Sequence, residues 1–323
     1  DALVAVPDGR GGWAVGETLA EARVAAGKVQ GRRTTVEARP PLEVPPGDWA
    51  TTLRTSWVEP AYLETDASWC EPGGDPASPL ANGGAFGGKV DSPAPAAARA
   101  LADEYGRAVL VLLAREDCVR MGPKRPPVAA GIAADGTGVM RVVRTAAIAD
   151  RIAAAAPELV VEEVDAAGPP TSISPRGSGW VEAAVLLAGW RGHPEVTVRD
   201  PFTGGEATAT VAAGTVRVAV RAGDALDEIV LRSYCVGAAH QALGWVTSEG
   251  LAVDDAGEVH DLTIRSFGIL RAVDMPAVEV TVEPDDRAPT AVATAVLAAV
   301  AGAAWVAQGC PPDWPTGEPV RRA

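Results

Sequence analysis

Short stretches in which apolar residues alternate with polar ones, or continue without interruption, recur along the whole chain. Alternation places apolar side chains on one face of an extended strand, and a short uninterrupted run is typical of a strand buried on both faces. Two of these stretches flank Asp135-Gly136, a dipeptide that favours a hairpin turn. The strands predicted in this way cover residues 2–6, 51–57, 108–113, 126–133, 138–144, 194–199, 207–220, 259–269 and 278–282.

Longer stretches rich in alanine, leucine and valine have the spacing of helices and alternate irregularly with these strands. Glycine is favoured just after a last helical turn, where Gly27 and Gly106 stand, and proline is tolerated in a first turn, where Pro95 stands. Because hairpins and helices mix without regular strand–helix–strand order, the predicted fold class is α+β, with mixed sheets and packed helices. The predicted helices cover or lie within residues 17–27, 95–105, 145–156, 180–188, 224–248 and 289–306.

Composition and charge narrow the class of protein. The chain has 323 residues, of which 47% are apolar, so it can bury a large core. Its net charge of −14 disfavours binding to nucleic acid or to an anionic membrane surface. The sequence contains no apolar run long enough to span a membrane and no signal peptide. We therefore expect a cytoplasmic protein with neither nucleic-acid nor membrane partners.

The cysteines give no sign of a metal site. Cys70, Cys118, Cys235 and Cys310 lie far apart in the sequence, and the three histidines are also dispersed. Zinc and iron–sulfur sites need closely spaced ligand pairs such as C-x-x-C. The sequence therefore predicts no metal-ligating residues and free, buried thiols in a reducing compartment.

Residues 83–89 read Gly-Gly-Ala-Phe-Gly-Gly-Lys, the densest glycine run in the chain. Glycine is used where the backbone approaches another group closely or takes a positive φ. Such a run favours backbone N–H groups that point toward an anionic ligand, around an aromatic ring that we expect to be buried. The alternative is a glycine-rich turn between two strands. Lys89 is expected either to contact a ligand or to stand at the surface before the next helix.

Five segments, taken in order, resemble one protein family. They read Tyr-Leu-Glu-Thr (62–65), the glycine run (83–89), Ala-Arg-Glu-Asp continuing to Gly-Pro-Lys-Arg-Pro (114–126), Ser-Pro-Arg-Gly-Ser-Gly (174–179) and Gly-Ala-Ala-His-Gln-Ala-Leu-Gly (237–244). Together they resemble the large, molybdopterin-binding subunit of the xanthine dehydrogenase/aldehyde oxidase family, the molybdenum hydroxylases. The resemblance spans about residues 55–305 and implies a compact version of that fold. It divides the chain into a partial strand–helix unit with a Pro-rich linker (1–48) and two molybdopterin-binding-like halves (49–190 and 191–323).

The resemblance also implies a cofactor, partners and a site. The cofactor is molybdenum–molybdopterin, and the partners are iron–sulfur and FAD subunits in an oligomeric assembly, with no iron–sulfur cluster or flavin on this chain. The Phe86-Gly87 pair is placed beside the metal, and Arg176 orients the substrate. The residues that the resemblance assigns to cofactor binding are Gly84, Ala85, Phe86, Gly87, Gly88, Gly177 and Gln241.

The sequence departs from the family pattern at the residues that do chemistry. The family's general base is a glutamate in a Gly-Val-Gly-Glu loop before the last long helix, and such a base must reach the proton that it removes. Here residues 283–288 run from a strand into that helix without the motif. Glu283 or Asp286 could substitute as the catalytic carboxylate, whereas Glu318 follows the helix instead of preceding it. Tyr234 stands where the family usually has a cofactor-binding glutamine.

Two functions from different classes are compatible with these observations. The first is the molybdopterin-binding subunit of an oxidoreductase that hydroxylates a heterocycle or an aldehyde. The alternative is a degenerate, non-redox family member that acts as a scaffold or assembly subunit or as a repurposed small-molecule-binding protein, because the family's catalytic glutamate is missing. A third arrangement is a site that another chain completes.

Overall fold

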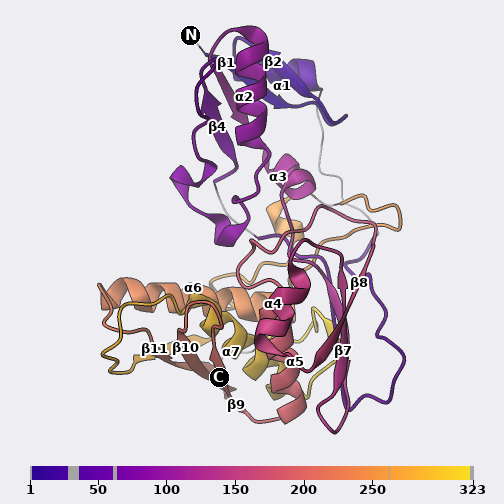
Figure 1. The fold of residues 1–323 in the computed structure, drawn as a ribbon, viewed down its shortest axis with the longest axis vertical. Helices are drawn as coiled ribbons and strands as arrows, with labels where there is room; N and C mark the ends of the chain where they lie inside the picture. The colour runs from indigo at the N-terminus through magenta and orange to yellow at the C-terminus, as the bar shows by residue number, and fades with distance from the viewer. Residues whose placement is uncertain (1, 28–35, 61–63, 261, 321–323) are drawn as a thin grey trace.

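The structure, a computed structural model, describes residues 2–27, 36–60, 64–260 and 262–320. Figure 1 shows a small lobe that begins with the N-terminal strands and a large lobe that contains most of the chain. Three sheets, each flanked by helices, make up the two lobes, so the predicted α+β class is confirmed. The division of the chain at residues 48 and 190 stays a prediction.

The small lobe is built on one mixed sheet. Strands β1 and β5 are parallel, and the other two pairs are antiparallel. Helix α2 ends where Gly106 takes a left-handed conformation with φ of 62°. In spatial order the strands are β2 (Trp13–Gly16), β1 (Leu3–Pro7), β5 (Val109–Leu112) and β4 (Ala67–Cys70). The helices are α1 (Leu19–Ala26), α2 (Ala94–Tyr105) and, toward the large lobe, α3 (Arg115–Met121).

The large lobe contains two sheets. In the first, β6 and β7 form the hairpin that Asp135-Gly136 predicted. Its order is β13 (Asp313–Trp314), β3 (Thr51–Thr55), β6 (Val128–Ile132), β7 (Gly138–Val143) and β8 (Leu159–Val164). The second sheet has the order β12 (Ala277–Val282), β11 (Thr215–Arg221), β10 (Glu206–Ala212) and β9 (Glu195–Arg199).

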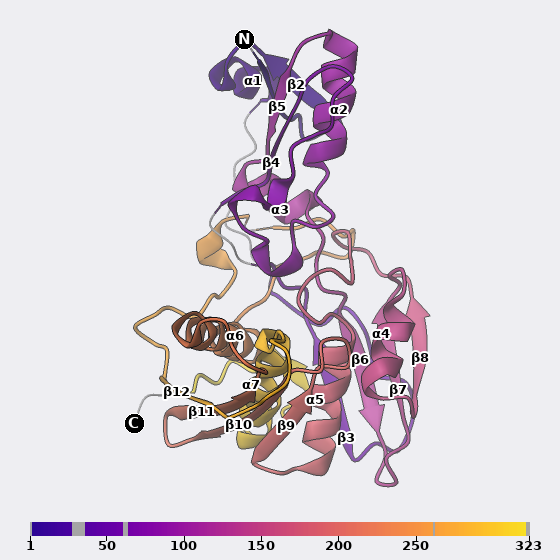
Figure 2. The same cartoon turned by 60° about the vertical axis from the view of Figure 1, so that its left-hand side comes forward.

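Four helices fill the space around and between these two sheets. They are α4 (Ile148–Ala155), α5 (Trp180–Arg191), α6 (Glu228–Thr247) and α7 (Ala293–Ala307). Figure 2 shows α5 between the two sheets, and α7 packs against α5, α6 and β10. Because α7 is enclosed by these elements, it is apolar on all sides and does not have a polar face. The ring of Trp314 lies edge-on to Trp245 at 4.8 Å and to Trp305 at 5.9 Å.

A buried ion pair joins two chain segments that cross between the lobes. Lys124 Nζ lies 2.9 Å from Glu59 Oε2, and both side chains are buried. The same ammonium group donates to two backbone carbonyls at the end of α3. The backbone of Lys124 is also hydrogen-bonded on both sides to the loop at residues 168–179. The junction between the lobes is therefore tied directly to the second glycine-rich loop.

The predicted strand at residues 259–269 is wrong. Ile264–Ser266 form one turn of 3-10 helix, and Gly268 turns the backbone with φ of 73°. A Cβ atom at Gly268 would lie 1.9 Å from the carbonyl oxygen of Ser248. The chain therefore folds back against the end of α6 instead of extending.

The predicted start of α7 also differs, and one helix and four short strands were not predicted. Helix α7 begins at Ala293 instead of residue 289. Helix α3, directly after β5, was not predicted, and Asp117 stabilises its first turn by accepting the N–H of Ala114 at 2.9 Å. The strands that were missed are β2, β4, β8 and β13.

Candidate ligand-binding site

The glycine run forms tight turns that use some of its own amides. Ala85 and Phe86 adopt left-handed backbone conformations, with φ of 50° and 53°. The N–H of Gly87 donates to Gly84 O and the N–H of Gly88 donates to Ala85 O, both at 2.9 Å. These two amides are occupied within the run and do not face a ligand. The expectation that the Phe86 ring is buried is wrong, because the residue is 37% exposed.

The run lies against the second glycine-rich loop. The N–H of Arg176 donates to Phe86 O at 2.7 Å. Gly87 has φ of 92°, and a Cβ atom there would lie 1.9 Å from Ser174 O. Only glycine allows this approach, so the loop at residues 83–89 and the loop at residues 168–179 meet at Gly87.

The side chain of Arg176 connects this loop contact to α6. Its guanidinium carbon lies 4.9 Å from the centre of the Phe86 ring, and its Nη1 donates to Gln241 Oε1 at 3.1 Å. Gln241 projects from the second half of α6. The structure thus brings together three residues, from three separate segments, that the resemblance assigned to one site. Their roles in binding stay predictions.

The charge of Arg176 is poorly compensated. Burial and the neighbouring guanidinium of Arg125 lower the pKa of Arg176 to about 10. Among the residues that the structure describes, no carboxylate forms an ion pair with Arg176. The Arg176 guanidinium could therefore bind an anionic group of a ligand.

Arg125 holds the backbone of Arg176 in place. Its Nη1 donates to Arg176 O at 2.7 Å, while its Nε donates to Glu182 Oε1 at 2.5 Å and its Nη2 to Glu182 Oε2 at 3.2 Å. The guanidinium also lies 4.4 Å from the Trp245 ring centre. Glu182 Oε2 accepts the N–H of Gly179 at 2.8 Å, which caps the start of α5. Neither residue was predicted to belong to the site, and the one signal of Glu182 in the sequence is its position as an acid in the first turn of a helix.

A groove of about 590 Å³ opens beside Arg176. It runs between the first half of α6 and the segment that leads into α7, residues 289–294. Leu226, Val230 and Tyr234 contribute apolar or aromatic surface to its wall. The acidic residue in its lining is Asp227, whose carboxylate accepts the N–H groups of the first turn of α6. That carboxylate is therefore committed to the helix cap and is not positioned as a base.

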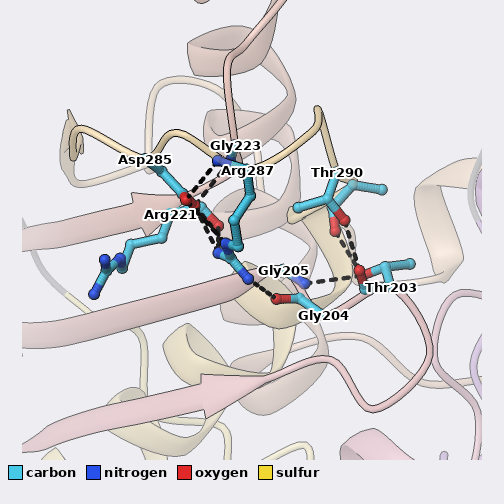
Figure 3. A network of polar contacts seen from close by, with 9 residues as sticks. Thr203, Gly204, Gly205, Arg221, Gly223, Asp285, Arg287 and Thr290 are labelled. Carbon is cyan, nitrogen blue, oxygen red and sulfur yellow. Dashed lines mark hydrogen bonds and ion pairs between the residues drawn. The ribbon is translucent and has the colours of Figure 1, made fainter.

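The segment before α7 is fastened to the second sheet of the large lobe (Figure 3). Asp285 accepts the N–H of Gly223 at 3.0 Å and pairs with Arg287 at 2.6 Å, and these bonds hold the pKa of Asp285 well below its usual range. Thr290 Oγ1 donates to Thr203 O at 2.7 Å. This network explains why α7 begins later than predicted, because residues 285–291 bind the sheet instead of continuing the helix.

The predicted catalytic carboxylates lie outside the groove lining. Glu283 is exposed at the end of β12, where its N–H donates to Val220 O at 2.9 Å. Asp286 is also exposed. Neither belongs to the lining of the groove beside Arg176. A catalytic role for Glu283 therefore stays a prediction without a contact to support it.

Gly177 serves close packing between helices. It has φ of 68°, and a Cβ atom there would lie 2.3 Å from Val181 Cγ2 and 2.5 Å from Thr294 Cγ2. This glycine lets the second loop contact the first turns of both α5 and α7.

Lys89 was expected either at the surface or in contact with a ligand. Its side chain is buried, so the expected surface position is wrong.

The residues present do not fit the molybdopterin cofactor that the resemblance implies. A pterin cofactor carries many polar groups, and a protein must supply donors and acceptors for them. Among the described residues, the side-chain donors that their mutual contact places here are the Arg176 guanidinium and the Gln241 amide, while the amides of Gly87 and Gly88 are used within the glycine run.

A much smaller cavity of about 20 Å³ lies behind Gln241. Its lining includes Arg125, Trp245 and Glu249. Burial raises the pKa of Glu249 to about 8, which favours the neutral carboxyl at pH 7. Within the described ranges, no three histidine, cysteine or acidic side chains come together as a metal site, and no helix has the length and apolar character needed to cross a membrane.

Comparisons with known proteins give distant likenesses. No protein-family model matches the sequence, and no curated protein matches it. Reconstituted CO dehydrogenase from Oligotropha carboxidovorans is 8% identical with a TM-score of 0.47, over 79% of this chain and 71% of that one. Quinoline 2-oxidoreductase from Pseudomonas putida 86 is 8% identical with a TM-score of 0.45, over 80% and 73% of the two chains. Aldehyde oxidoreductase from Desulfovibrio gigas is 13% identical with a TM-score of 0.34, over 71% and 42%. Scores below 0.5 do not define a shared fold, so these likenesses do not assign this chain to a family.

Proposed function

We propose that this chain is a non-redox relative of the molybdenum hydroxylases that binds a small anionic molecule in the groove beside Arg176. The observation that carries the proposal is the environment of this guanidinium, which contacts Phe86 and Gln241 but pairs with no carboxylate of the described residues. An anionic ligand would supply the missing negative charge. The apolar wall of the groove suits the body of such a ligand.

The contacts support binding more than catalysis. A hydroxylase of the resembled type needs a carboxylate that can remove a proton in the site. The carboxylate of Asp227 caps α6, and that of Asp285 pairs with Arg287. Asp227 in the groove lining therefore already has a structural task and Asp285 lies outside that lining, so Arg176 is the charged group of the lining that remains for a ligand.

The oxidoreductase itself is the second candidate function. It is favoured by one observation, the mutual contact of Phe86, Arg176 and Gln241, which come from three segments that resemble the family. In that case the chain would act as the molybdopterin-binding subunit beside iron–sulfur and FAD subunits, and the general base would come from another chain.

Replacing Arg176 with glutamine is expected to weaken the binding of benzoate at least about tenfold. A hydrogen bond to a charged group contributes about 1.5–3 kcal/mol, and about 1.4 kcal/mol corresponds to a factor of ten. Isothermal titration calorimetry measures the affinity, with benzamide as the uncharged analogue. Arg191→Gln removes an exposed arginine of α5 and is the matched control. Equal affinities in all three proteins, or a wild-type chain that binds neither benzoate nor inorganic phosphate, would contradict the proposal.

Metal analysis separates the two candidate functions. Protein purified from a host that makes the molybdenum cofactor is expected to contain molybdenum far below one atom per chain, because too few donors converge at Arg176. Elemental analysis and the fluorescence of oxidised pterin measure the two components. Stoichiometric molybdenum together with pterin would replace the proposed function by the oxidoreductase.

A further inference from the structure

The small cavity behind Gln241 is lined by polar side chains from separate segments of the chain. Gln241 and Trp245 lie one turn apart on α6, and Glu59 comes from the segment that crosses between the lobes. The cavity volume of about 20 Å³ is too small for a metabolite, whereas a water molecule needs about 10–15 Å³. The full lining is Val58, Glu59, Pro60, Arg125, Pro175, Gln241, Trp245, Glu249 and Leu297.

Two of these side chains are buried without a hydrogen-bond partner among the described residues. Trp245 is 4% exposed, and its indole N–H donates to no acceptor there. Glu249 is 8% exposed, and its carboxyl group forms neither a hydrogen bond nor an ion pair within the same part of the chain. Buried polar atoms in folded proteins are nearly always hydrogen-bonded, either to protein groups or to an ordered water. Both groups therefore indicate that the cavity holds a small polar ligand.

The end of α6 places the Glu249 carboxyl next to this part of the helix. The N–H of Glu249 donates to Gly244 O at 2.8 Å, so the chain turns back at the helix end. A Cβ atom at Gly244 would lie 2.0 Å from Glu249 Oε1, so the carboxyl lies against the residue that precedes Trp245. A third group of the lining is Glu59, whose Oε1 accepts no hydrogen bond from the described residues while Oε2 pairs with Lys124.

We propose that this cavity binds one water molecule, which accepts the indole N–H of Trp245 and bridges the carboxyl groups of Glu249 and Glu59. Buried waters typically make about three hydrogen bonds, which matches the three groups available here. An ion is a poorer occupant. The guanidinium of Arg125 in the same lining repels a cation, and the carboxylate of Glu59 repels an anion.

The water connects the junction between the lobes to the support of the groove. Glu59 pairs with Lys124 at the junction, and Gln241 in the cavity lining accepts from Arg176 Nη1. The site stands independently of the ligand proposed above, because Trp245 and Glu249 lie outside the lining of the groove beside Arg176.

The indole N–H of Trp245 reports the water directly. In the full chain with isotope-labelled tryptophan, we expect a rotating-frame Overhauser cross-peak between this proton and water, with the sign of dipolar contact and not of hydrogen exchange. Trp314 is the control in the same molecule, because its indole N–H is also buried without a partner among the described residues but does not line this cavity. We expect no such cross-peak at Trp314. Trp245→Phe and Trp314→Phe assign the two signals.

Two variants at Glu249 separate a bound water from the proton of the carboxyl group. Glu249→Met removes both oxygens from a side chain of similar length, so the cross-peak is expected to be lost. Glu249→Gln keeps an oxygen acceptor but has no carboxyl proton, so the cross-peak is expected to remain. The indole signals of the other tryptophans check that both variants are folded.

Four results would overturn the proposal. They are the absence of the cross-peak at Trp245 in the wild-type chain, an equal cross-peak at Trp314, its retention in Glu249→Met, and its loss in folded Glu249→Gln. The last result would assign the signal to the carboxyl proton instead of a water. If Glu249→Met does not fold, the comparison of Trp245 with Trp314 in the wild-type chain decides the question without it.

Discussion

Replacing Glu182 with glutamine is expected to lower the free energy of unfolding by about 3–5 kcal/mol, because it leaves the Arg125 guanidinium buried without a counter-charge. Both partners are buried, and the pair is bidentate. The substitution also weakens the bond from Gly179 N–H that caps α5. Urea unfolding of the variant and the wild-type chain measures the difference.

A half-exposed pair provides the control. Glu162→Gln breaks the contact of Glu162 with Arg141 on the first sheet of the large lobe, and pairs of this kind contribute about 0–1 kcal/mol. The double variant Arg125→Met with Glu182→Leu removes both charges, so it is expected to recover most of the lost stability while losing the support of the Arg176 carbonyl. Equal destabilisation by the Glu182 and Glu162 variants would contradict the importance of the buried pair.

Replacing Glu249 with glutamine is expected to stabilise the fold at alkaline pH by several kcal/mol. The pKa of this carboxyl is about 8 in the folded chain, against an ordinary value of 4.5. The folded state thus holds the proton more tightly than the unfolded state, so stability is fully present below pH 4.5 and falls as pH rises toward 8. At about 1.4 kcal/mol per pKa unit, the full loss is of order 3–5 kcal/mol. Glutamine cannot ionise and avoids this loss.

The measurement is a pair of stability curves against pH. Unfolding free energies of the wild-type chain and Glu249→Gln should converge below pH 4.5 and diverge steadily up to about pH 8, above which the gap approaches a constant value. Glu258→Gln replaces an exposed glutamate in the loop after α6 and should follow the wild-type curve. Parallel curves for the wild-type chain and Glu249→Gln would show that the carboxyl is ionised, and therefore solvated, in the folded state.

Local signals in the sequence predicted much of the fold. Asp135-Gly136 marks the β6–β7 hairpin and Gly106 marks the end of α2, because each needs only neighbouring residues to define its conformation. The strand predicted at residues 259–269 failed because its apolar residues face a buried cluster from an irregular loop, with Phe267 and Leu262 among the core residues. A run of apolar residues indicates that the segment is buried. It forms a strand only when neighbouring strands pair with it.

The site was predictable only in part. Glycine and proline mark the loops that carry Phe86 and Arg176, so the sequence drew attention to both. The ion pair between Arg125 and Glu182 joins residues 57 positions apart, and nothing local indicates it. The bond from Gly223 N–H to Asp285, 62 positions apart, likewise depends on a contact between distant segments, whereas Arg287 pairs with Asp285 from only two residues away. Such contacts decide whether a carboxylate is free to act as a base. The sequence could therefore suggest Glu283 as a catalytic carboxylate, but it could not show whether Glu283 lies in the groove.

The buried ion pair of Glu59 and Lys124 connects the chain segments at the junction between the two lobes. Lys124 is bonded to the end of α3 on one side and to the loop at residues 168–179 on the other. Arg125, the next residue, holds the carbonyl of Arg176. Two consecutive residues, Lys124 and Arg125, therefore connect the end of α3 to the backbone of the loop that carries Arg176.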